Sequence, residues 1–144
     1  HALDARVPLV IDADALNLVA ASASLREAVK ARRAPTLATP HPAEAARLLG
    51  NTTADVQRDR LGAATTLARA LNAHVVLKGT GSVLVHPDGR FDVNASGNPA
   101  LASAGSGDVL SGLVGALLAQ GLDLCSAGLD WIGHSQRARP WRTR

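Results

Sequence analysis

One stretch near the C-terminus combines small residues with a single carboxylate in a way that suits phosphate chemistry. Residues 98–112 read NPALASAGSGDVLSG, and the spacing predicts a small-residue apolar helix over 109–119. Such a loop lets backbone N–H groups converge on an anion, and the helix adds the positive end of its dipole. Asp108 would repel a phosphate that was merely bound there. It fits better as a base that acts on a hydroxyl while the loop neutralises charge on a transferred phosphoryl group.

A structural role is the competing interpretation of this stretch. Asp108 could serve only as an N-terminal helix cap, and the glycines only as a turn. A lone Gly-x-Gly would favour that structural interpretation, but the length and order of residues 98–112 favour the catalytic one.

Two further side chains stand where a predicted strand ends. Lys78 follows an apolar strand, and it is one of two lysines among 15 basic residues. Its alternative role is that of a solvated strand end. His41 lies between two prolines just before a predicted helix, so it is rigidly presented, although a lone loop histidine is more often a surface residue. Cys125 and His134 suggest no role.

Two acids, Asp12 and Asp14, follow the first apolar run. They alternate along extended backbone and therefore face opposite ways, which argues against both binding one ion. We expect one of them to cap the helix that follows, and Asn17 to be structural.

The elements that must position these residues alternate between strand and helix patterns. Short apolar runs predict strands at 7–11, 36–39, 74–78, 82–86 and 90–93. Helical spacing predicts helices after Asp14, over 24–33, over 42–49 and over 54–72, with residues 94–107 as a loop. Ser24 and Glu27 have the spacing of a capping box. The fold class is therefore α/β with a largely parallel sheet and a hairpin at one edge.

Composition narrows the class of protein. The 144 residues are 47% hydrophobic and 19% charged, which is typical of a globular domain. No apolar run approaches the ~18–20 residues of a membrane span. A single cysteine, Cys125, excludes an internal disulfide framework and fits a cytoplasmic location. Four arginines lie within residues 137–144, so the net charge of the remaining chain is close to neutral. With two Trp, one Phe and no Tyr, few aromatic side chains could stack on bases, and we expect no nucleic-acid partner.

Four segments in order resemble the ADP/ATP-dependent NAD(P)H-hydrate dehydratases of the ribokinase-like superfamily. VIDADALN at 10–17 resembles V-x-D-A-D-A-L-N, TPHPAE at 39–44 resembles T-P-H-P-G-E, VLKGTGS at 76–82 resembles V-L-K-G-A-G-T, and 98–112 resembles N-P-x-x-A-x-G-G-S-G-D-V-L-x-G. Ala43 and Ala104 stand where the family usually has glycine. The resemblance covers residues 7 to about 122 and corresponds to the C-terminal half of the family's domain.

This resemblance implies a cofactor-repair reaction on a three-layer α/β/α fold that here lacks its N-terminal part. Hydrated NADH or NADPH is dehydrated while ADP or ATP is split, with Mg²⁺ on the phosphates rather than on a protein metal site. By position, Asp108 would be the base and would contact the hydrated dinucleotide together with His41. The anion hole would be Ala104, Gly105, Ser106 and Gly107, and the adenine nucleotide would be held by Lys78, Gly79, Thr80, Gly81, Ser82 and Gly107. A homo-oligomer is implied, fused to or working with an epimerase of the hydrates.

Two alternatives remain open at this stage. One is a small-molecule kinase of the same superfamily, of the thiazole or hydroxymethylpyrimidine type. The other is a truncated, inactive nucleotide-binding fragment, because the chain begins with His1 and holds no methionine. We expect residues 1–122 to be part of a dehydratase domain and residues 123–144 to be a divergent, disordered basic tail.

Overall fold

The computed structural model describes residues 2–79, 82–93, 112 and 116. Their elements follow one another as η1 (Ala2–Asp4), β1 (Leu9–Ile11), α1 (Asp14–Ala21), α2 (Ala23–Lys30), β2 (Thr36–Ala38), α3 (Pro42–Leu49), α4 (Thr53–Arg58), α5 (Arg60–Leu71), β3 (His74–Leu77), β4 (Val83–Val85) and β5 (Phe91–Val93). The predicted loop at 94–107, the predicted helix at 109–119 and the predicted tail at 123–144 lie outside the described residues, apart from two helical positions at 112 and 116.

The strands form one mixed sheet in the order β1-β2-β3-β4-β5. The first three are parallel, with Val10 opposite Leu37 and Ala38 opposite Val75. Strand β4 is antiparallel to both β3 and β5, and β4 and β5 form a hairpin at the edge of the sheet. The prediction of an α/β fold with parallel strands and an edge hairpin is therefore confirmed.

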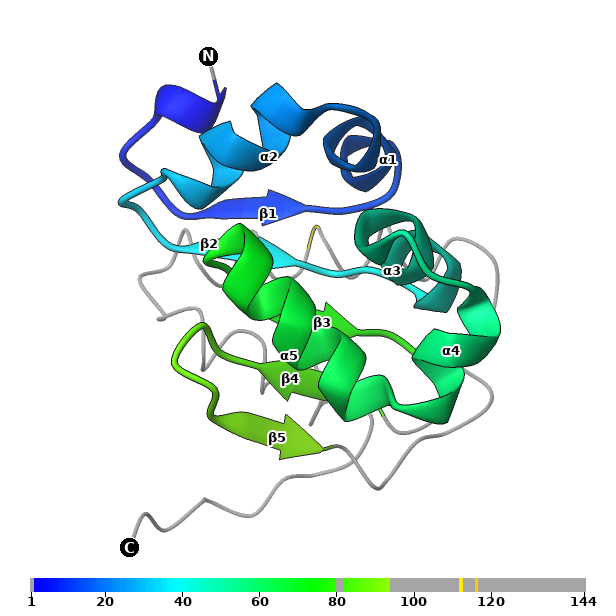
Figure 1. Cartoon of the computed structure of the whole chain (residues 1–144). Coiled ribbons are helices and arrows are strands. Elements are labelled where there is room, and N and C mark those ends of the chain that lie inside the picture. The colour runs from blue at the N-terminus through cyan, green and yellow to red at the C-terminus, as the bar shows by residue number, and fades with distance from the viewer. Residues whose placement is uncertain (1, 80–81, 94–111, 113–115, 117–144) are drawn as a thin grey trace, which may run out of the picture.

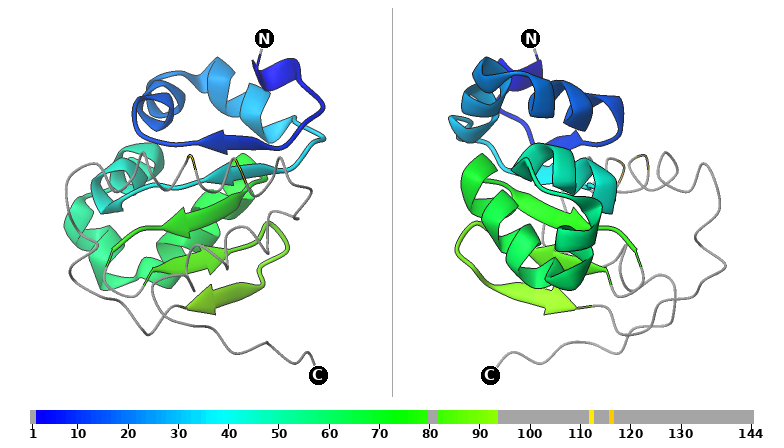
Figure 2. Two further views of the ribbon diagram at one scale, coloured as in Figure 1. Left: turned by 180° about the vertical axis from the view of Figure 1, so that it is seen from behind. Right: turned by 45° about the vertical axis from the view of Figure 1, so that its right-hand side comes forward.

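The helices α1 to α5 lie on one face of this sheet (Figures 1 and 2). Side chains alternate between the two faces of a strand. Val75, Leu77, Val83 and Val85 belong to the core beneath the helices. Their neighbours on the opposite face, Leu37, Val76 and Leu84, are also fully buried. Burial on both faces is the pattern of a sheet between two layers.

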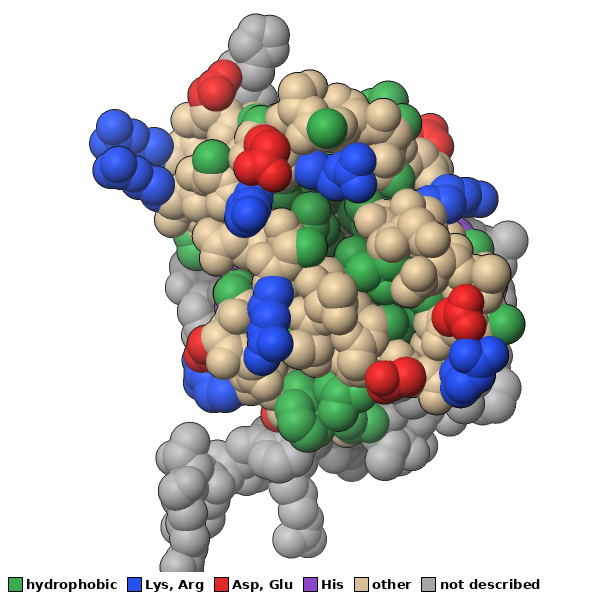
Figure 3. Space-filling model, in the orientation of Figure 1, with side chains coloured by type: hydrophobic (Ala, Val, Ile, Leu, Met, Phe, Trp, Pro, Cys, Tyr) green, Lys and Arg blue, Asp and Glu red, His purple; other side chains and the backbone are tan. Residues whose placement is uncertain are grey.

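The outer strand β5 departs from that pattern. Phe91 and Val93 share the helix-bearing face with Val85 and Val83, their partners in β4, yet they remain 51% and 53% exposed. Hydrophobic side chains accordingly gather over β5 at the lower edge of Figure 3. None of the described helices reaches across this strand.

The helix predicted over 54–72 is in fact two helices, α4 and α5, separated at Asp59. The Asp59 carboxylate accepts a hydrogen bond from the backbone N–H of Gly62 at 2.8 Å and so begins a new helix. A side-chain acceptor that competes with the continuing backbone ladder is the physical reason for the break. The break places Arg60 in the first turn of α5.

The predicted cap of α2 is also wrong by two residues. Ser22, not Ser24, is the N-cap, and its hydroxyl accepts from the N–H of Leu25. By contrast, Pro42 begins α3 and Gly50 ends it in the left-handed conformation at φ 69°, as predicted. Within residues 2–79 and 82–93, every helix is too short or too polar to cross a lipid bilayer.

Candidate functional site

Three polar residues follow directly on the three parallel strands. Asp12 comes after β1, Thr39 after β2 and Lys78 after β3. Parallel strands bring their carboxyl ends to one edge, and β1 and β3 point the same way in Figure 1. Ligands of open α/β sheets bind outside this edge. Asp12, Thr39 and Lys78 therefore mark the candidate site.

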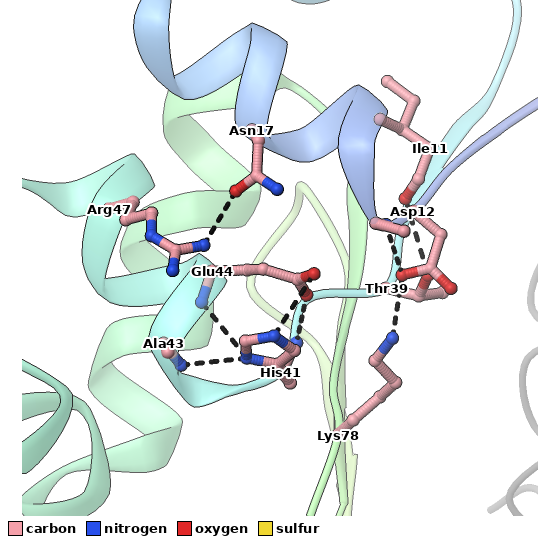
Figure 4. A network of polar contacts seen from close by, with 10 residues as sticks. Ile11, Asp12, Asn17, Thr39, His41, Ala43, Glu44, Arg47 and Lys78 are labelled. Atoms are coloured by element: carbon pink, nitrogen blue, oxygen red, sulfur yellow. Dashed lines mark hydrogen bonds and ion pairs between the residues drawn. The ribbon is translucent and has the colours of Figure 1, made fainter. Parts of the chain in front are cut away.

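An ion pair connects two of these strand ends. The ammonium Nζ of Lys78 lies 2.8 Å from Oδ1 of Asp12, and the two side chains are only 20% and 10% exposed. Figure 4 shows Lys78 reaching from β3 toward Asp12. Lys78 is thus not the solvated strand end of the alternative interpretation. It is a partly buried cation held at the edge of the sheet.

The turn after β1 explains why neither acid caps α1. Ala13 is the N-cap, at φ 49° and ψ −120°, and no side chain caps the helix. Oδ1 of Asp12 accepts from the N–H of Ala13 at 2.9 Å as well as from Lys78. Asp14 lies exposed in the first helical turn. The expectation of an aspartate cap is therefore wrong, because Asp12 is oriented toward Lys78 instead. A positive φ at a residue with a Cβ costs about 1–3 kcal/mol.

Backbone contacts hold the strand ends together. The N–H of Thr39 donates to the carbonyl of Ile11 at 3.1 Å, and its hydroxyl donates to the same oxygen at 3.4 Å. The N–H of Lys78 donates to the carbonyl of Pro40 at 2.8 Å. The segment that leads to His41 is thereby fixed beside the start of the turn after β3.

His41 is the N-cap of α3. Its Nδ1 accepts from the N–H groups of Ala43 and Glu44 at 3.1 and 3.3 Å. Glu44 returns the contact, since its Oε2 accepts from the N–H of His41 at 2.8 Å (Figure 4). Because Nδ1 is an acceptor, the ring proton belongs on Nε2, which lies 3.3 Å from Oε1 of Glu44. The side chain is still 48% exposed, so the ring has a structural role and an accessible face.

Two substitutions of His41 are expected to separate these roles. His41→Ala removes the cap and should lower the free energy of unfolding by about 1 kcal/mol. His41→Asn supplies another cap acceptor, so thermal unfolding should return close to that of the parent. If the imidazole also contacts the dinucleotide, His41→Asn should raise KM for that substrate while the melting temperature stays unchanged. Equal KM values for His41→Asn and the parent would contradict substrate contact.

Asn17 is structural, as expected. Its Oδ1 accepts from Nη1 of Arg47 at 2.8 Å and ties α1 to α3. This pair lies to one side of His41 in Figure 4, on helices that begin at the carboxyl ends of β1 and β2.

The described part of the predicted nucleotide-binding segment is a turn after β3. Gly79 has φ 132°, a conformation that favours glycine, and the Ser82 hydroxyl donates to its carbonyl at 3.0 Å. Thr80 and Gly81 lie outside the described residues, as do Asp108 and the predicted anion hole Ala104, Gly105, Ser106 and Gly107. Their roles remain predictions.

Asp12 is the site residue that the sequence reasoning missed as a partner of Lys78. The available signal was positional: Asp12, Thr39 and Lys78 each lie at the C-terminal end of a predicted strand, and the strands are parallel. Among residues 2–79 and 82–93, no group of three or more His, Cys, Asp or Glu side chains could hold a metal ion.

Proteins of known family are similar in sequence to most of this chain. A family model described as NAD(P)H-hydrate dehydratase matches residues 1–138. The chain is 50% identical over 120 residues to the ADP-dependent (S)-NAD(P)H-hydrate dehydratase of Neisseria meningitidis, covering 83% of this chain and 40% of that protein. It is 49% identical over 121 residues to the bifunctional NAD(P)H-hydrate repair enzyme Nnr of Mycobacterium tuberculosis, covering 84% of this chain and 24% of that protein. The chain thus spans less than half the length of these relatives.

One solved structure is similar to this chain in both fold and sequence. The ADP/ATP-dependent NAD(P)H-hydrate dehydratase of Bacillus subtilis, co-crystallised with ATP and Mg²⁺, superposes with a TM-score of 0.77 at 34% identity. The match covers 92% of this chain and 45% of that one. A ribokinase-like superfamily protein of Enterococcus faecalis superposes with a TM-score of 0.64 at 25% identity, covering 85% of this chain and 40% of that one. With the match over residues 1–138, this chain belongs to the NAD(P)H-hydrate dehydratase family and has the ribokinase-like fold.

Proposed function

We propose that this protein dehydrates hydrated NADH and NADPH to the intact reduced cofactors and couples this to the cleavage of ADP or ATP. The observation that carries the proposal is the cluster of Asp12, Thr39 and Lys78 at the carboxyl edge of three neighbouring parallel strands. The cluster supports the proposal because open parallel sheets bind their ligands outside this edge. Relatives named as dehydratases of the same hydrates support the substrate class.

The proposed reaction uses kinase chemistry to remove water. Asp108 takes the proton of the ring hydroxyl, and that oxygen attacks the terminal phosphorus of ADP. The bond from this phosphorus to the bridging oxygen breaks and leaves AMP. The phosphate ester then departs as inorganic phosphate while the ring loses a proton and regains its double bond. Phosphorylation is needed because hydroxide is a poor leaving group.

The remaining residues would bind and orient the two substrates. Lys78, with Gly79, Thr80, Gly81, Ser82 and Gly107, would hold the adenine nucleotide. Ala104 to Gly107 would neutralise charge on the transferred phosphoryl group. His41 would contact the hydrated dinucleotide through the face that its capping role leaves exposed.

Magnesium fits this site as an ion carried by the nucleotide. Mg²⁺ commonly keeps several waters and binds mainly through substrate phosphates. Among the described acids of the site, Asp12 already contacts the ammonium of Lys78 through its carboxylate. When bound, the ion would offset phosphate charge. We also propose that the protein is a cytoplasmic homo-oligomer. We propose further that it works with, or is fused to, an epimerase of the hydrates, because relatives are named bifunctional repair enzymes.

The test is nucleotide-dependent recovery of the reduced nicotinamide. The protein is incubated with hydrated NADH and Mg-ADP, and the absorbance of restored NADH is followed together with release of AMP and phosphate. We expect the three products in equal amounts and no recovery without nucleotide. Cooperative unfolding that ADP shifts, without recovery of NADH, would instead indicate an inactive nucleotide-binding fragment.

The kinase alternative predicts a different fate for the phosphate. A small-molecule kinase leaves the terminal phosphoryl group on its product, whereas the dehydratase releases it as inorganic phosphate. Transfer to a thiazole or hydroxymethylpyrimidine alcohol, with no recovery of NADH, would favour that alternative.

A further inference from the structure

Arg60 contacts the end of β3 from the first turn of α5. One guanidinium nitrogen, Nη2, donates to the carbonyls of Leu77 at 3.0 Å and Lys78 at 3.2 Å. A second guanidinium nitrogen, Nη1, donates to Oε1 of Gln57 at 2.9 Å. A single side chain therefore spans two successive carbonyls where the strand becomes the turn. Arg60 reaches them because Asp59 ends α4 and begins α5.

These contacts set the direction of the next peptide groups. In a planar trans peptide, the N–H points away from its own carbonyl, and no described peptide is cis. The Leu77 carbonyl faces Arg60, and the N–H of Lys78 accordingly points the other way, to Pro40. The Lys78 carbonyl also faces Arg60. The N–H of Gly79 must therefore point away from the Arg60 guanidinium, as the N–H of Lys78 does.

The contact between Arg60 and the turn is close. A Cβ on Gly79 would lie 3.2 Å from Nη1 and 3.3 Å from Nη2 of Arg60, and Gly79 already has φ 132°. Burial also lowers the pKa of the Arg60 guanidinium from its usual value, although arginine stays charged. Hydrogen bonds from a charged donor are stronger than those between neutral groups. Arg60 is thus a firm anchor for this backbone.

We infer that Arg60 is a positioning residue for the nucleotide: it holds the Leu77 and Lys78 carbonyls so that the Gly79 N–H faces the phosphates. This inference rests on the proposed function, because that function makes residues 78–82 the nucleotide-binding turn. Arg60 itself lies on the opposite side of these peptides from the donor. Its effect is therefore exerted through the backbone rather than through contact with the ligand.

The test compares Arg60→Lys with Arg58→Lys by isothermal titration with ADP. Both changes keep the charge, but only the first removes the two-carbonyl contact. Arg58 is 74% exposed and pairs with Asp55. We expect Arg60→Lys to raise Kd for ADP about tenfold and to raise KM for ADP while KM for the hydrated dinucleotide stays unchanged. Arg58→Lys should bind ADP like the parent. A merely structural effect would lower the melting temperature and raise KM for both substrates together.

Three further results would overturn the inference. If Arg60→Lys binds ADP as tightly as the parent, Arg60 does not position the nucleotide, and the proposed function still stands. If Arg60→Lys fails to fold, Gly79→Ala is the second variant, because its added Cβ would crowd the Arg60 guanidinium. Parent-like ADP binding by Gly79→Ala would refute the inference. If the parent protein itself binds no ADP, the nucleotide site and the proposed function are both wrong.

Discussion

Replacement of Asp108 by asparagine is expected to abolish nucleotide-dependent recovery of NADH from its hydrate. Asparagine is nearly the same size and can still cap a helix, but it cannot accept the proton of the ring hydroxyl. General-base catalysis contributes about 10²–10⁴-fold, so kcat should fall by that amount. Kd for ADP should change little or decrease, because a negative charge beside the phosphates is removed. The measurement is the rate of NADH recovery together with ADP titration.

Asp14→Asn provides the matched control for this experiment. It makes the same chemical change at an exposed acid in the first turn of α1. We expect parent-like kcat and stability from it. If Asp108→Asn kept its rate within a few-fold of the parent, Asp108 would be a helix cap and the catalytic interpretation of residues 98–112 would be wrong.

The second large effect is expected for Lys78→Met. The substitution keeps the length of the side chain but takes the ammonium from the Asp12 carboxylate, which is only 10% exposed. Loss of one partner costs about 3–5 kcal/mol for a buried ion pair. Since Lys78 is 20% exposed, we expect the free energy of unfolding to fall by about 2 kcal/mol after solvent screening. Kd for ADP should rise about 10–100-fold, as for loss of a charged hydrogen bond.

A double variant separates stability from binding in this pair. Asp12→Asn with Lys78→Met removes both charges, so most of the lost stability should return, whereas ADP affinity should stay low. Denaturant unfolding and ADP titration measure the two effects. Lys30→Met, at an exposed position on α2, is the control and should change neither. Parent-like ADP binding by Lys78→Met would contradict a role for Lys78 in the nucleotide site.

Much of this fold could be predicted from the sequence because the decisive signals are local. Apolar runs bounded by turn residues predicted all five described strands, and proline and glycine defined both ends of α3. The strands proved shorter at their ends than predicted, since β1 covers Leu9–Ile11 and not residues 7–11. The ordered motifs also predicted the family correctly.

The local competition between caps was less predictable. Ser22 and Ser24 both precede a helical pattern, and only the path of the chain out of α1 decides which hydroxyl meets a free N–H. Asp59 interrupts an apolar stripe that runs on without a break in the sequence, because a side-chain oxygen replaces one backbone acceptor. Such choices depend on a few hydrogen bonds of similar energy.

The sequence by itself determined that Asp12, Lys78 and His41 each lie at the end of a strand or the start of a helix. Only the tertiary structure decided that Asp12 and Lys78, 66 positions apart, form an ion pair, and that Arg60 holds the backbone after β3. It also showed that the His41 side chain caps α3, so any contact with substrate would be a second role of the same ring. The physical reason is that sequence patterns report local conformation, whereas these contacts arise from the parallel pairing of separate strands and the packing of α5 against them.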